Sequence, residues 1–118
     1  MCKRNEELTV ILRNALSIEN STVVEVNTKT ISYVIAGKNK VKHISVSDVI
    51  VDTMLYLSKL NDVKTKFRIN NEIDGISYTL RFTTLCKKPL YKITTDVWLD
   101  TVVKGYFTYL ELVKEGKI

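Results

Sequence analysis

KTKFRINNEIDGISYTLRFTT, residues Lys64–Thr84, is the stretch that decides the fold class, because its pattern predicts a β-hairpin. In its first half, basic residues alternate with Thr65, Phe67 and Ile69. In its second half, apolar and polar residues again alternate. Residues 70–75 between the halves are the predicted loop, with Asp74-Gly75 as a strong turn signal. Side chains on a strand point alternately to its two faces. The hairpin therefore has one apolar face, which we expect to be buried, and one basic face.

The register of this hairpin follows from matching apolar with apolar residues across the two strands. The predicted pairs are Ile69 with Ile76, Phe67 with Tyr78, Lys66 with Thr79 and Lys64 with Arg81. Like charges directly opposite one another destabilise a sheet. A pair of cations kept in that position points to an anionic partner.

The segments on either side of the hairpin complete an α+β pattern. Apolar spacing and capping residues predict helices over residues 6–16, 48–60 and 96–115. Ser45 and Ser47 are the N-cap candidates of the second helix, Thr95 is that of the third, and Gly116 is its C-terminal stop. Alternation and turn residues predict strands over residues 22–26, 30–36, 40–46 and 91–94. Residues 102–109 also suit a strand, so the last helix has an alternative. We predict a single domain, residues 1–118, of class α+β: a small antiparallel sheet, built from a β-meander plus the hairpin, with about three helices packed on one face.

Several function classes lack the residues they need. The 118 residues include one histidine, His43, and two cysteines, Cys2 and Cys86, and no Gly-rich phosphate loop. We therefore expect no metal, no cofactor and no enzymatic activity. Two unpaired thiols indicate a reducing, cytoplasmic location, and the short apolar runs indicate no membrane partner.

The positive charge is concentrated in one part of the chain. The net charge is +5, and residues 64–92 alone carry that excess while the rest is balanced. The cations of this segment are Lys64, Lys66, Arg68, Arg81, Lys87, Lys88 and Lys92. Such a cluster either keeps a strand face solvated or binds phosphates. We predict the second: a partner that is nucleic acid or a nucleic-acid-associated protein.

An alternative function rests on the C-terminal helix. This helix has more apolar positions than one core-facing stripe requires, and they include the aromatic residues Trp98, Tyr106 and Tyr109. Exposed Trp and Tyr are frequent anchors of protein interfaces. The alternative is therefore a protein-binding module, either an inhibitor of a host factor or a component of an assembly, with a homodimer as the expected form of self-association.

The residue usage favours a particular kind of source. Lys, Asn, Ile, Tyr and Phe account for 42 residues, whereas Gly, Ala, Arg and Pro account for 11. The first set has AT-rich codons. Together with the small size, this usage is typical of accessory proteins of phages and large DNA viruses.

Overall fold

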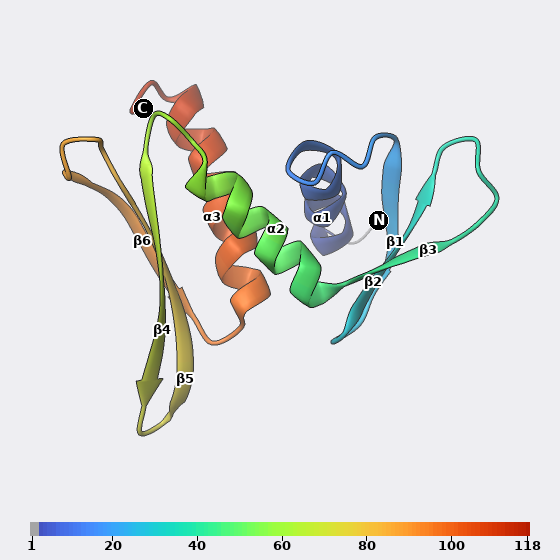
Figure 1. Ribbon diagram of the computed structural model, residues 1–118, viewed down its shortest axis with the longest axis horizontal. Coiled ribbons are helices and arrows are strands. Elements are labelled where there is room, and N and C mark those ends of the chain that lie inside the picture. Colours follow the sequence, from blue (N-terminus) through green and yellow to red (C-terminus); the bar gives the residue numbers. More distant parts are fainter. Residues whose placement is uncertain (1–2) are drawn as a thin grey trace. The chain divides into compact units, whose positions relative to one another are not determined.

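The computed structural model describes residues 3–118, and these form an α+β fold with three helices and two antiparallel three-stranded sheets (Figure 1). The α+β prediction is confirmed. The elements in chain order are α1 (Lys3–Asn14), β1 (Ser21–Val26), β2 (Thr30–Ile35), β3 (Lys42–Ser45), α2 (Val46–Ser58), β4 (Lys64–Glu72), β5 (Gly75–Thr83), β6 (Pro89–Thr95) and α3 (Trp98–Lys114). The chain divides into two compact units, Met1–Thr53 and Met54–Ile118, with the boundary inside α2.

The first unit is the β1-β2-β3 meander with α1 packed on β1. The side chain of Thr9 on α1 joins the two elements, since its Oγ1 accepts a hydrogen bond from the backbone N–H of Val23 at 2.9 Å. Arg13 makes a second link, because its Nε donates to the carbonyl of Ser21 at 2.6 Å. The buried apolar side chains here are Leu8, Ile11, Leu12, Val23, Ile31, Tyr33 and Val49. The unit leads into α2, whose start is capped by Ser45 as the sequence predicts.

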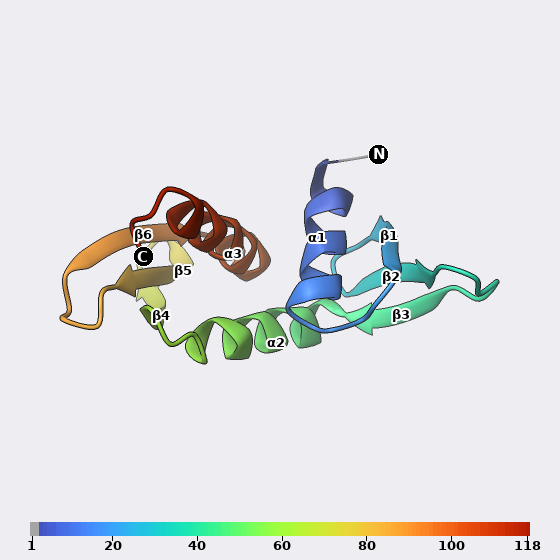
Figure 2. The ribbon, with the colours of Figure 1, turned by 90° about the horizontal axis from the view of Figure 1, so that it is seen from above.

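The second unit is the β4-β5-β6 sheet with α3 along one face (Figure 2). Gly105 brings α3 close to β5, because a Cβ at this position would overlap the side chain of buried Leu80. At the start of α3, the Trp98 ring packs on Tyr78 with centroids 4.4 Å apart, and its Nε1 donates to the Sδ of Met54 at 3.1 Å. The apolar face of this sheet is buried at Leu80 and Phe82, but the expected burial does not extend to the hairpin end, where Ile69 and Ile76 are 57% and 52% exposed. The opposite face carries the odd-numbered side chains of β5.

Residues 102–109 belong to α3, so their alternative assignment to a strand is wrong. The helix ends at Lys114 with Glu115 as its C-cap, and Gly116 follows as the predicted C-terminal stop, with a φ of 74° that glycine adopts without strain. The N-cap is Val97 and not Thr95. The Thr95 hydroxyl instead bonds to the hydroxyl of Thr101 at 2.6 Å, and this contact ties the end of β6 to the helix.

The predicted hairpin register is wrong by two residues. The strands continue through Asn70, Asn71 and Glu72, which the sequence places in the loop, and Glu72 pairs with Gly75. A shorter turn fixes a different register, and a shift of two preserves which residues share a face. Phe67 thus pairs with Leu80, and the observed basic pairing is Lys66 with Arg81 in place of Lys64 with Arg81.

Candidate nucleic-acid interface

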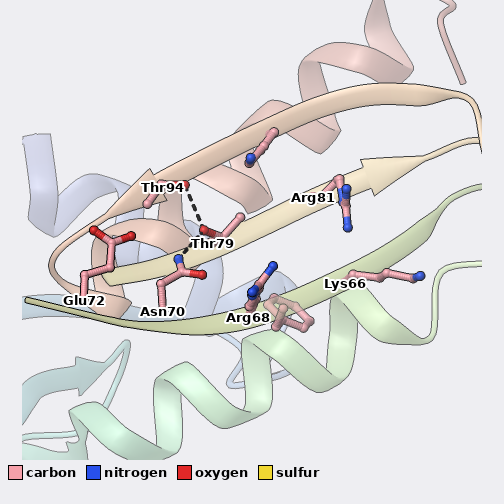
Figure 3. Close-up of a pocket in the computed structure, with 9 residues that line it drawn as sticks. Lys66, Arg68, Asn70, Glu72, Thr79, Arg81 and Thr94 are labelled. Carbon is pink, nitrogen blue, oxygen red and sulfur yellow. Dashed lines mark hydrogen bonds between the residues drawn. The ribbon is translucent and has the colours of Figure 1, made fainter. Parts of the chain in front are cut away.

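The face of the second sheet that α3 leaves uncovered contains a hollow of about 400 Å³ (Figure 3). We call it the basic hollow, because four of its nine lining residues are cations. All three strands contribute to it. The lining residues are Lys66, Phe67, Arg68, Asn70, Glu72, Thr79, Arg81, Lys92 and Thr94.

Three of the cations form one row across the sheet. Lys66 on β4 pairs with Arg81 on β5, and Arg81 pairs with Lys92 on β6. We call these residues the cation row. Neighbouring strands lie about 4.8 Å apart, so the row is about 10 Å wide at the backbone. Arg68 lies two residues further along β4, opposite Thr79, and brings a fourth positive charge into the same hollow.

None of these four cations forms an ion pair with an acidic residue anywhere in residues 3–118. Glu72 lines the same hollow but lies four residues beyond Arg68 on β4, close to the turn. At ~3.3 Å per residue its backbone is ~13 Å from that of Arg68. The hollow is therefore positive at one end and negative at the other, and the positive charges are open to an external anion.

Neutral polar side chains fill the middle of the hollow and are fixed by hydrogen bonds. Nδ2 of Asn70 donates to Oγ1 of Thr79 at 2.8 Å and to Oγ of Ser77 at 3.2 Å. Oγ1 of Thr79 also bonds to Oγ1 of Thr94 at 2.8 Å. This network links β4, β5 and β6 (Figure 3). It orders the surface on which a ligand would rest.

The structure brings together four of the seven cations that the sequence predicts as binding residues: Lys66, Arg68, Arg81 and Lys92. Lys64 shares their face of the sheet but does not line the hollow. Lys87 and Lys88 lie in the exposed turn between β5 and β6, where the backbone N–H of Lys88 bonds to Oγ1 of Thr84. They are outside the hollow as well.

Sequence reasoning missed the uncharged and acidic part of this site. Asn70 and Glu72 were assigned to a loop, and only the observed register shows that they continue the basic face of β4. Thr79 was placed on the outer face, but its bond to Thr94 depends on the pairing of β5 with β6. Thr94 lies two residues from Lys92 on β6, so strand alternation places both side chains on one face. This alternation is the one signal that would have found Thr94.

The aromatic residues of the alternative interface make contacts inside the second unit. Tyr106 is 1% exposed and packs on Tyr56. Trp98 is half-buried against Tyr78. The hydroxyl of Tyr109 donates to the carboxylate of Asp62 at 3.0 Å, and burial, followed by this hydrogen bond and the charge of Asp62, raises the Tyr109 pKa to about 12. The apolar side chains that α3 exposes are Leu110 and Val113.

The sequence offers His43 and the two cysteines as further chemically reactive side chains. His43 is exposed on β3 and its Nδ1 bonds to the hydroxyl of Ser32 at 2.9 Å. Cys86 is free and exposed, and Cys2 lies outside the described residues. The described residues contain no cluster of three or more His, Cys, Asp and Glu side chains suited to a metal ion. No helix within them has both the length and the apolar character to cross a bilayer.

Comparison with known proteins gives no match to any family model, curated protein or solved structure.

Proposed function

We propose that this chain is a non-enzymatic accessory protein that binds nucleic acid through the basic hollow. The observation that carries the proposal is the cation row, in which Lys66, Arg81 and Lys92 are direct cross-strand neighbours. Like charges in this arrangement destabilise the sheet. A bound polyanion would remove that repulsion. Solubility does not require cations on three adjacent strands to lie side by side, so anion binding explains the row better.

The charge pattern favours a phosphate backbone over other anions. Lys and Arg side chains neutralise phosphates and release counterions, and this release supplies most of the affinity of sequence-independent binding. The cations of the basic hollow would contact phosphates, and contacts to phosphates carry no sequence information. We therefore expect weak binding that depends strongly on salt and little on sequence.

The alternative of a protein interface on α3 has less support. Tyr106 belongs to the core, and Trp98 and Tyr109 are occupied by contacts within their own unit. Self-association through the exposed Leu110 and Val113 stays a prediction. Light scattering tests it: a dimer mass supports a second interface, and a monomer mass at high concentration contradicts it.

Two variants with equal charge change test the main proposal. Lys66→Glu with Arg81→Glu reverses two members of the cation row, whereas Lys64→Glu with Lys104→Glu reverses two exposed lysines outside the hollow. We expect the first variant to lose binding to a labelled oligonucleotide at low salt and the second to keep most of it. Equal loss in both variants would mean that net charge alone attracts the nucleic acid, and the proposal would be wrong.

A nuclease assay tests the expectation that the protein is not an enzyme. Labelled DNA and RNA incubated with the protein and Mg²⁺ should stay intact over hours. Cleavage that co-purifies with the wild type and disappears in the Lys66→Glu, Arg81→Glu variant would contradict it.

A further inference from the structure

We infer that the basic hollow takes a single strand of nucleic acid and not a duplex, an inference that rests on the function proposed above. The first argument is size. The cation row is about 10 Å wide at the backbone, and the hollow encloses about 400 Å³, near the lower end of the ~300–1,000 Å³ range of small-molecule pockets. The major groove of a duplex is by itself about 12 Å wide. A whole duplex is too wide to enter and would touch only the rim, whereas about one nucleotide fits inside.

The second argument is the direction of the cations. Arg68 on β4 and Arg81 on β5 point into the hollow from two neighbouring strands, as Figure 3 shows. Side chains that converge from two strands contact the same phosphate only if that phosphate lies between them. A flexible single strand can insert its backbone in this way. A duplex holds its phosphates on the surface of a stiff, wide cylinder, so it cannot bend one of them into the hollow.

The third argument is the set of acceptors at the other end of the hollow. The Glu72 carboxylate and the Oδ1 of Asn70 accept no hydrogen bond from any of residues 3–118. Both repel phosphate oxygens and attract hydrogen-bond donors. Unpaired bases offer such donors on their Watson–Crick edges, and RNA adds its 2′-hydroxyls, whereas base pairing occupies the Watson–Crick donors in a duplex. We therefore place phosphates at the cation row and a sugar or an unpaired base toward Glu72.

Fluorescence anisotropy of the full chain with four matched probes tests this inference: a mixed-sequence single-stranded DNA, the RNA of the same sequence, and the blunt duplex of each. We expect both single strands to bind about tenfold more tightly than their duplexes at the same salt. We also expect Lys66→Ala to weaken single-strand binding more than Lys64→Ala, which removes the same charge from the same strand and face but outside the hollow.

The outcomes separate this inference from the proposed function. Duplexes that bind as tightly as single strands would overturn the inference and leave nucleic-acid binding intact. Equal effects of Lys66→Ala and Lys64→Ala would also overturn it, because the strand would then lie outside the hollow. If no probe binds at low salt, the proposed function itself is wrong.

Discussion

Gly105 controls how closely α3 approaches the sheet that forms the basic hollow, and its replacement by alanine should destabilise the second unit. A Cβ at position 105 would overlap Cδ1 of Leu80 and lie 3.1 Å from Cδ2. Leu80 is 0% exposed, at the centre of β5, so its side chain can move away only by displacing other atoms of a close-packed core. Forcing an extra methyl group into a packed core costs about 1–3 kcal/mol.

An opposing effect reduces this cost. Alanine in a helix interior is more favourable than glycine by about 1 kcal/mol. The overlap with Leu80 is the larger effect, so we expect Gly105→Ala to lower the free energy of unfolding by about 1 kcal/mol, within a range of about 0–2.

In the Leu80→Ala background, the effect of Gly105→Ala on the free energy of unfolding should change sign. Leu80→Ala alone should cost about 2–5 kcal/mol, because it leaves a cavity against α3. In that background the new Cβ at position 105 enters empty space, and Gly105→Ala should become stabilising by about 1 kcal/mol through helix propensity. Urea unfolding followed by the fluorescence of Trp98, the one tryptophan of the chain, measures all four proteins. If Gly105→Ala has the same effect in both backgrounds, the close approach of α3 to β5 is not what requires glycine.

Three further predictions concern the rest of the molecule. Thr9→Val should destabilise the first unit by about 1–3 kcal/mol, because it leaves the buried N–H of Val23 without its acceptor; faster hydrogen exchange of that amide would show it, and unchanged exchange would contradict it. Because the pKa of Tyr109 is raised from 10.0 to about 12 in the folded state, its contribution to stability is complete below pH 10 and is lost as the pH rises to about 12. Tyr109→Phe should remove that part of the pH dependence, and an unchanged profile would mean that the pKa of Tyr109 is not raised in the folded state. Arg81→Gln should stabilise the sheet by about 0.5 kcal/mol at low salt, since it relieves repulsion from two cross-strand lysines; a gain that does not shrink in high salt would rule out repulsion as its cause.

The local pattern of this sequence was enough to predict the fold class and the faces of the hairpin. Alternation placed Lys66 and Arg68 on one face and Phe67 on the other, and a register error of two residues left that division unchanged. Capping chemistry likewise predicted Gly116 and gave Ser45 as one of two candidates, although its choice of Thr95 was wrong. Strand alternation and helix capping both depend on residues a few positions apart, where the backbone can adopt few conformations.

Pairing between distant segments was not predictable in the same way. That Lys92 joins Lys66 and Arg81 depends on how β6 pairs with β5, which includes an irregularity between Phe82 and Thr83. The division of the strands into two sheets is also a property of long-range packing. The contact of Tyr106 with Tyr56, a half-buried residue 50 positions away in the sequence, is likewise a product of tertiary packing that helical spacing alone does not predict.

The salt dependence of binding by the wild-type protein tests the central claim most directly. One phosphate shared by Arg68 and Arg81, with the phosphates on either side of it at Lys66 and Lys92, predicts a slope of about −2 for log K against log salt concentration, and an affinity about 20-fold lower at ~200 mM than at ~50 mM salt. Reversing Lys66 and Arg81 should reduce the slope to about −1.4. A slope near zero, or one that the reversal leaves unchanged, would contradict the account, because the cations of the basic hollow would then make no contact with phosphate.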